Sequence, residues 1–281
     1  MKKLSKDSCY LRKRAIFYYL SFFLEERFSN FSKIMREEIK SFEEALMYPL
    51  IFSIYHEENK IDSAYFYIKK IVEGKDFTEV EPWHLGSYAR ILYKENEIEK
   101  SKLAYGYLIF YYDIPNYKDT LKEILGENYE KEIEKLEKEI EKKYKKIPEF
   151  ELTLLDGRLF KYKENKDKIM VLNFWCTGCG PCVKEIPQLN ELVKRFKDKK
   201  NVIFIAVTRE SKKVIENFVK KQNFDYLLAV EDKDLHRKLN ISAFPTHIIV
   251  DKKGRIVWKI LGALSDIDKK IEEKIYKLLQ Y

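Results

Sequence analysis

Three cysteines lie within the eight residues WCTGCGPC (175–182), directly after the apolar run KIMVLNFW (168–175). That run has the length and composition of a buried strand, and a helical pattern follows from Cys182 to about Phe196. Reactive groups of α/β folds gather at the carboxyl ends of such strands. With only Cys9 besides, the chain has too few cysteines for a structural disulfide framework, so the cluster indicates catalysis or metal binding.

The sequence after Pro148 predicts an α/β domain. EFELTLLDGRLFKY (149–162) alternates around Asp156-Gly157, a strong hairpin signal. Further strands are expected at 201–208, 226–230, 246–251 and 255–262, with helices at 211–222, up to 239 and at 266–280. Strands that alternate with helices of this length predict βαβ units and a partly parallel central sheet.

Residues 1–146 predict an all-α domain, because apolar and aromatic residues recur at helical spacing. Two segments correspond, NKIDSA (59–64) and NEIEKS (96–101), each at the turn of a helix–turn–helix unit. The repeat resembles the tetratricopeptide pattern, whose period is about 34 residues; an ordinary pair of helical hairpins is the alternative. We therefore divide the chain into a helical domain, 1–146, and an α/β domain, 147–281.

The end of the helical domain is rich in Lys and Glu. Within it an apolar stripe at heptad spacing is formed by Ile133, Leu136, Ile140 and Ile147. A coiled coil needs about three to four heptads, and this stripe has two. We expect a solvated helix that packs on one side and leads out of the domain before Pro148.

The active-site stretch carries a family resemblance. NFWCTGCGPCVKEIP (173–187), with Phe244-Pro245-Thr246 before a late strand, resembles the TlpA/ResA-like thiol-disulfide oxidoreductases of the thioredoxin superfamily, over about 148–281. The resemblance implies a thioredoxin-like fold, no cofactor, and protein disulfides or dithiols as substrates. It also implies a cis peptide bond before Pro245 and a backbone at Phe244 that pairs with a bound peptide.

The spacing of Cys179 and Cys182 suits thiol-disulfide exchange. Cys179 stands just before a helix, whose N–H groups and dipole stabilise a thiolate, so we expect it to be the nucleophile. Cys182 lies on the first turn and can resolve a mixed disulfide. Pro181 suits a first helical turn, and Gly180 leaves room for a substrate chain. We place Trp175 in the same substrate surface.

Two positions depart from the family pattern. Gly178 stands where Trp is frequent, so the lip of the site loses an aromatic contact. Asn173 stands where thioredoxin has an ionisable Asp. Glu185, one turn beyond Cys182, is our candidate for proton transfer, and a solvated helix residue is the alternative.

Cys176 is expected to be an inert, buried thiol. Strand alternation places it on the face of Leu172 and Phe174. A regulatory disulfide with Cys179 is the competing interpretation, which would need the two Cα atoms to lie within about 7 Å.

Other functions fit the residues less well. A metal site needs further ligands, and the histidines are scattered and are expected to be surface or packing residues: His56, His84, His236 and His247. Peroxide reduction is disfavoured because the Pro-x-x-x-Thr-x-x-Cys frame is missing around all three cysteines. An adaptor with a vestigial redox domain is the alternative to an enzyme, and a protein partner on the helical domain fits either.

Charge and the N-terminus bear on location. The net charge of +8 comes from 54 basic residues interleaved with 46 acidic ones, which disfavours a nucleic-acid partner. The apolar run at 15–24 is too short to span a bilayer, so we expect an amphipathic helix and no membrane span. We favour a reductant, because Gly-Pro between the cysteines is the thioredoxin choice. We expect it in the cytoplasm, because the apolar run at 15–24 is not followed by a signal-cleavage pattern. An exported or membrane-anchored protein is the alternative, since most TlpA/ResA-like proteins work outside the cytoplasm.

Overall fold

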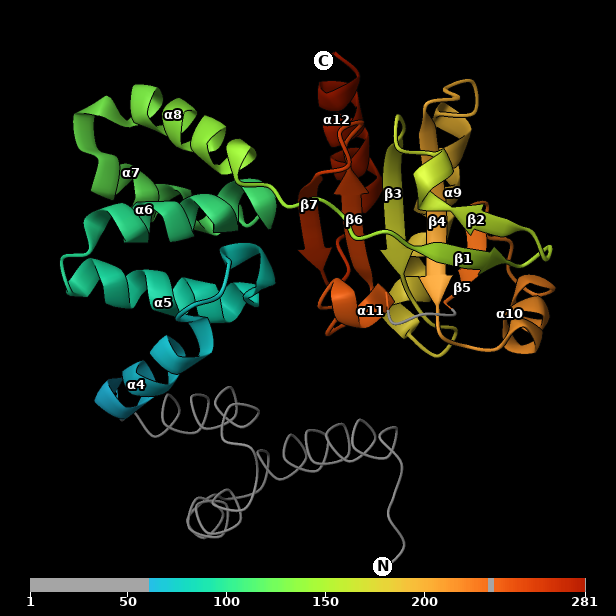
Figure 1. Ribbon diagram of the computed structural model, residues 1–281, viewed down its shortest axis with the longest axis horizontal. Coiled ribbons are helices and arrows are strands. Elements are labelled where there is room, and N and C mark those ends of the chain that lie inside the picture. Colours follow the sequence, from blue (N-terminus) through green and yellow to red (C-terminus); the bar gives the residue numbers. More distant parts are fainter. Residues whose placement is uncertain (1–60, 232–234, 281) are drawn as a thin grey trace, which may run out of the picture. The chain divides into compact units, whose positions relative to one another are not determined.

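The computed structural model describes residues 61–231 and 235–280 (Figure 1). The chain divides into two compact units, 1–73 and 74–281, and each is treated by itself. In the first unit the described helix is α4 (Ile61–Val72). Cys9, the apolar run at 15–24, His56 and the first predicted turn at Asn59 lie outside the described residues. Within the described ranges, no helix is long and apolar enough to cross a membrane.

The second unit begins with helices. Their bounds are α5 (Pro82–Lys94), α6 (Ile98–Gly106), α7 (Lys118–Leu125) and α8 (Tyr129–Lys142). After α6 the chain continues as a π-helical turn over Tyr107–Tyr111. Helices fill this segment as the periodicity predicted, with no strand before β1 in the described part.

Helices α5 and α6 form the hairpin that the second repeat segment predicted. Asn96 turns the chain with φ of 62°, a left-handed conformation that Asn tolerates. Ser101 on α6 is buried, and its hydroxyl donates to the Ala89 carbonyl of α5 at 2.9 Å. The small side chain thus brings the two helices together. Tetratricopeptide-like stacking of two such hairpins stays a prediction.

Helix α8 packs on one side, as predicted. Leu136 and Ile140 are buried, whereas Ile133 is half-buried. A Cβ atom at Gly106 would lie 2.5 Å from Ile140 Cδ1, so α6 and α8 approach closely at this glycine. The chain then enters the sheet region, where the Ile147 N–H donates to the Gly254 carbonyl at 2.9 Å.

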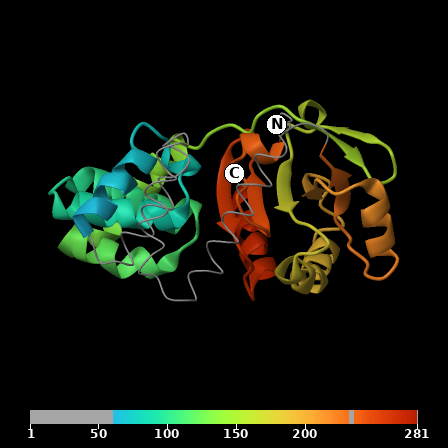
Figure 2. The same ribbon diagram turned by 90° about the horizontal axis from the view of Figure 1, so that it is seen from below.

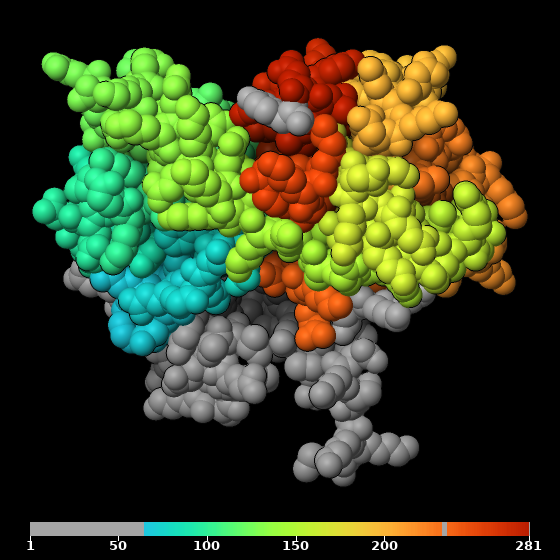
Figure 3. All heavy atoms as spheres, turned by 45° about the horizontal axis from the view of Figure 1, so that its top comes forward, coloured from blue at the N-terminus to red at the C-terminus, as the bar shows by residue number. Residues whose placement is uncertain are grey.

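Seven strands form one mixed sheet in the order β2-β1-β5-β4-β3-β6-β7 (Figure 1). Their bounds are β1 (Glu151–Leu154), β2 (Leu159–Lys161), β3 (Ile169–Phe174), β4 (Val202–Thr208), β5 (Leu227–Val230), β6 (Thr246–Val250) and β7 (Ile256–Leu261). Strands β3, β4 and β5 are parallel, and the other pairs are antiparallel. The β1–β2 hairpin lies at the surface (Figure 3) and turns at Gly157 with φ of 90°, which confirms the hairpin signal. This is the predicted thioredoxin-like α/β fold.

Helices cover both faces of the sheet (Figure 2). Helices α9 (Gly180–Arg195) and α12 (Ile267–Leu279) contact each other over one core, which Ile215 of α10 (Lys212–Val219) joins. Phe174 points to the other face, where its ring meets His236 of α11 (Leu235–Lys238) at 4.9 Å. Strand β3 is buried along its whole length, so it brings the cysteine motif to the middle of the sheet's carboxyl edge.

Candidate active site

Cys179 and Cys182 are joined by a disulfide, with Cα atoms 5.3 Å apart. Cys179 is the N-cap of α9, and its sulfur accepts the Cys182 N–H at 3.3 Å. Cys182 is buried, with 3% of its surface exposed, whereas Cys179 is half-buried. An incoming sulfur can therefore reach Cys179 more readily than Cys182, and the helix N-terminus stabilises negative charge at the Cys179 sulfur.

Hydrogen bonds hold the loop before the disulfide against β4 and against Glu210, which follows β4. The Trp175 N–H donates to the Val207 carbonyl at 3.1 Å. Thr177 donates both its N–H and its hydroxyl to the Glu210 carboxylate, each at 2.7 Å. The Cys179 N–H closes a turn onto the Cys176 carbonyl at 3.1 Å. Glu210, which we did not predict, thus helps to fix the approach to Cys179.

The predicted substrate surface around Cys179 is open. Gly178, Gly180 and Pro181 are all exposed. A Cβ atom built at either glycine would meet no atom of the described chain within 4 Å. Among the described residues, none obstructs a polypeptide that approaches the backbone of Gly178 and Gly180.

The Phe244–Pro245 peptide bond is cis, which confirms that prediction. Strand register places it beside the dithiol loop, because Phe174 at the end of β3 pairs with Thr246 at the start of β6. Phe244 is half-buried, and its ring packs perpendicular to His236 with centroids 5.7 Å apart. The predicted peptide-pairing segment thus lies at the same edge of the sheet as Cys179.

Trp175 lies in the core and not in the open surface. It is 1% exposed, and its ring meets Phe218 and Phe224 edge-on at 5.2 and 5.3 Å. The side chain points to the α9 side of the sheet, where it can stabilise the core beneath the motif. We therefore do not count Trp175 among the substrate-contacting residues.

Cys176 is half-buried and is not disulfide-bonded. The prediction of a buried position on the face of Leu172 and Phe174 is wrong, because β3 ends at Phe174 and strand alternation does not extend to Cys176. The disulfide between Cys176 and Cys179 is not formed in this structure, in which Cys179 is bonded to Cys182.

Glu185 and His247 form a buried pair behind the disulfide. Glu185 is 2% exposed, so it is not a solvated helix residue, and His247 is fully buried. Glu185 Oε2 lies 3.0 Å from His247 Nε2, and Oε1 accepts the Leu264 N–H at 2.9 Å. Sequence reasoning treated His247 as a surface or packing residue and missed its polar partner. The signal was in the strand register, which sets His247 opposite Asn173.

The other histidines described are apart from this pair. His84 and His236 are buried, the first on α5 and the second on α11. In the described part of the chain, no group of three or more His, Cys, Asp or Glu side chains could hold a metal ion.

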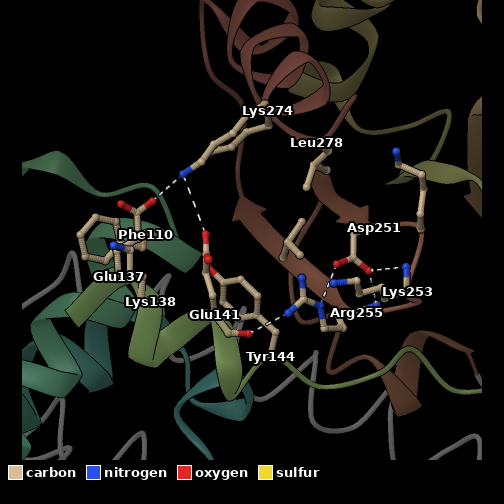
Figure 4. Close-up of a pocket in the computed structure, with 13 residues that line it drawn as sticks. Phe110, Glu137, Lys138, Glu141, Tyr144, Asp251, Lys253, Arg255, Lys274 and Leu278 are labelled. Atoms are coloured by element: carbon tan, nitrogen blue, oxygen red, sulfur yellow. Dashed lines mark hydrogen bonds and ion pairs between the residues drawn. The ribbon is translucent and has the colours of Figure 1, made fainter. Parts of the chain in front are cut away.

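One concavity of the described chain has no cysteine in its lining (Figure 4). It has a volume of about 450 Å³ and is bordered by α8, β7 and α12. Its charged groups bind one another: Arg255 donates to Asp251 at 2.7 Å and to the Glu141 carbonyl at 3.1 Å, and Lys277 pairs with Glu137 at 2.6 Å. These contacts hold α8 against the sheet region, and we assign this cleft a structural role.

The chain is similar in sequence to proteins named as thiol-disulfide oxidoreductases. The AhpC/TSA family model matches residues 144–259. The thiol-disulfide oxidoreductase ResA of Bacillus cereus is 34% identical over 119 residues, which cover 42% of this chain and 69% of that protein. The thioredoxin-like protein YneN of Bacillus subtilis is 30% identical over 130 residues, covering 46% of this chain and 75% of that protein. A crystal structure of a thioredoxin-family thiol:disulfide interchange protein from Chlorobium tepidum is 26% identical, with a TM-score of 0.42, and covers 47% of this chain and 95% of that one.

Proposed function

Because the chain belongs to the ResA-like family of thiol-disulfide oxidoreductases, we propose that Cys179 and Cys182 exchange disulfides with protein substrates and act as a reductant. The observation that carries the proposal is the unequal setting of the two sulfurs. Cys179 caps α9 and is half-exposed, while Cys182 is buried one turn behind it. This arrangement suits Cys179 as the nucleophile and Cys182 as the resolving thiol.

The exchange takes place in two steps. The Cys179 thiolate attacks a substrate disulfide, forms a bond to one substrate sulfur, and releases the other as a thiolate that takes a proton from water. Cys182 then gives its proton to Glu185 and attacks the Cys179 sulfur. The Cys179–Cys182 bond forms and the mixed disulfide breaks. Two electrons pass to the substrate, and a reduced dithiol of another protein is needed to restore Cys179 and Cys182.

The direction of exchange is proposed from Gly180 and Pro181, the thioredoxin pair. Equilibrating the protein with dithiothreitol or glutathione buffers gives the reduction potential of Cys179–Cys182. We expect a value below about −220 mV, nearer to thioredoxin than to the oxidant DsbA. Such a potential suits a reducing compartment, and we propose the cytoplasm. A value near about −120 mV would show an oxidant instead.

Activity on a small disulfide tests the function itself. We expect the wild-type chain to reduce it with dithiothreitol as the electron source, and Cys179→Ser to lose this activity. The exposed backbone at Gly178, Gly180 and Pro181, with Phe244 opposite, is our proposed contact surface for substrate. Retention of activity in Cys179→Ser would refute the assignment.

We further propose that the helical domain, with a boundary near residue 146, binds a protein partner or the substrate. Trp83 and Tyr93 on α5 are 54% and 47% exposed. Glu81, at the start of α5, hydrogen-bonds the side chain of Ser242, in the loop that leads to Phe244. A protein that packs on Trp83 would therefore lie near the proposed substrate segment.

Substitution of one exposed aromatic residue tests this role. Trp83→Ala should weaken reduction of a protein substrate and leave reduction of a small disulfide unchanged. Tyr276→Ala on α12 is the matched control, since Tyr276 is 45% exposed but belongs to the C-terminal helix. Equal effects of the two variants on the protein substrate would count against a binding role for α5.

A further inference from the structure

We propose that His247 is a positioning residue, which holds the Glu185 carboxylate toward Cys182 for the step that closes the Cys179–Cys182 disulfide. The inference rests on the proposed exchange function and adds a residue to its second step. His247 comes from β6, Glu185 from α9 and Asn173 from β3, so three elements converge on this chain of polar groups.

Both oxygens of Glu185 have a donor. The Leu264 N–H donates to Oε1 at 2.9 Å, and His247 Nε2 lies 3.0 Å from Oε2. The side chain of Glu185 is 3% exposed and that of His247 is fully buried. Since water does not reach the pair, these two contacts decide how the carboxylate is oriented.

Asn173 selects the tautomer of His247. Its Nδ2 lies 3.4 Å from His247 Nδ1, and the two residues are paired in the β3–β6 register. An amide N–H donates, so Nδ1 accepts and the ring proton is on Nε2, where it faces Glu185. Asn173 Oδ1 is buried without a hydrogen-bond partner in the described part of the chain. The polar contact of this side chain with the His247 ring is therefore made by its Nδ2.

Glu185 and Cys182 are both buried on α9, three residues apart, a spacing that suits Glu185 to take a proton from Cys182. Residues three apart are neighbours on a helix surface, with Cβ atoms about 5–6 Å apart. Tyr226, before β5, is a titratable group close enough to feel the Glu185 charge; burial raises its pKa well above the usual value, and the Glu185 charge adds to this. Tyr226 therefore stays protonated, and the Cys182 proton passes to Glu185 as the Cys182 sulfur bonds to Cys179. His247 acts on this step only through Glu185, so it is a positioning residue and not a catalytic one.

Two variants of His247 separate positioning from packing. In His247→Gln the amide nitrogen can occupy the place of Nε2 and still donate to Glu185. In His247→Asn, which is shorter by one methylene, it can occupy only the place of Nδ1. Both variants are made with Cys9→Ser and Cys176→Ala, so that only Cys179 and Cys182 carry thiols.

The reduced variants are mixed with 5,5′-dithiobis(2-nitrobenzoate), which releases one coloured thiolate in each step. The first release reports the attack by Cys179, and the second reports closure by Cys182. We expect the first to be unchanged in both variants. At pH 7 the second should slow by about 10-fold or more in His247→Asn, with its pH profile moved to higher pH, and should recover to within about 2-fold in His247→Gln.

Failure of the His247 role and failure of the exchange function give different results. A second release in His247→Asn with the rate and pH profile of the parent would overturn the role of His247 and leave the exchange function in place. A Cys179→Ser chain, which keeps only the Cys182 thiol, can release one thiolate at most; its release at the rate of the parent's first step would overturn the exchange function itself. His84→Gln, on α5, is the control for removing a buried histidine. If His247→Asn lacks the native circular dichroism spectrum, Asn173→Ala takes its place, because it removes the donor to His247 Nδ1. A slower second release in Asn173→Ala supports the proposal, and an unchanged second release overturns it.

Discussion

The Lys259 ammonium is buried and donates to the main-chain carbonyl of Asn240 at 3.0 Å. A second bond, at 3.1 Å, goes to the Leu239 carbonyl. Lys259 is on β7, whereas Asn240 begins the loop that leads to Phe244 and Pro245. The contact therefore ties the proposed substrate segment to the sheet. Burial lowers the pKa of Lys259 from its usual value near 10.5 to about 8, and the nearby Glu81 charge partly opposes this.

This lowered pKa makes stability depend on pH in the alkaline range. Between about pH 8 and 10.5 the unfolded chain keeps the Lys259 proton that the folded chain has released, so the free energy of unfolding should rise with pH. The contribution is on the order of 3 kcal/mol across that window. Urea denaturation of the wild type and of Lys259→Met, from pH 7 to 10, measures it as the difference between the two.

Above about pH 10 buried tyrosines lower the free energy of unfolding as the pH rises, so the measurement ends at pH 10. Burial raises the pKa of Tyr107 and Tyr144, so above about pH 10 the unfolded chain loses these protons first and stability falls. Both chains carry these tyrosines, and their effect cancels in the difference. A difference that stays constant over this range would show that Lys259 titrates normally.

His84 should make the protein sensitive to acid. Burial lowers its pKa to about 4, with a smaller contribution from Lys75, and its Nε2 accepts the Trp83 indole N–H at 3.2 Å. Below about pH 6.5 His84 binds a proton in the unfolded chain, whereas in the folded chain it stays neutral down to about pH 4. The free energy of unfolding should therefore fall as the pH drops through this window, by on the order of 3 kcal/mol.

Denaturation of His84→Gln at pH 7 and pH 4.5 checks this directly. The variant should lose less stability than the wild type between the two values. If both lose the same amount, some other group is responsible for the acid sensitivity.

Cys176 should be dispensable for exchange. It is half-buried, outside the disulfide, and next to Thr177, whose N–H donates to the Glu210 carboxylate. Cys176→Ala should leave the reduction potential and turnover unchanged and cost at most about 1 kcal/mol of stability. Peptide mapping of the oxidised wild type should find Cys179 joined to Cys182. Recovery of Cys176 linked to Cys179 in substantial yield would make it part of the chemistry.

The sequence predicted those parts of the fold that depend on local pattern. The Asp156-Gly157 turn, strand β3 and the helix that follows the cysteines each carry a signal within about ten residues, and each is found. Cys176 shows where this reasoning ends. Alternation gives the direction of a side chain only while the strand continues, and β3 stops two residues earlier.

The polar residues behind the dithiol needed the tertiary structure. His247 and Glu185 are 62 positions apart in the chain, and Thr177 and Glu210 are 33 apart. No local period connects such residues, because the pairing of β6 with β3 and the packing of α9 bring them together. Glu185 was predicted from its place one turn beyond Cys182, but a helix position alone does not say whether the side chain faces water or the sheet.

The most direct test of disulfide exchange is to trap its intermediate. Purified Cys182→Ser and Cys179→Ser chains, each also carrying Cys9→Ser and Cys176→Ala, are mixed with a disulfide-containing protein and analysed by non-reducing mass spectrometry. We expect Cys182→Ser to accumulate a stable mixed disulfide at Cys179, because no thiol remains to resolve it. Cys179→Ser should form almost none. A mixed disulfide that forms at Cys182 as fast as at Cys179 would contradict the assignment of nucleophile and resolving thiol.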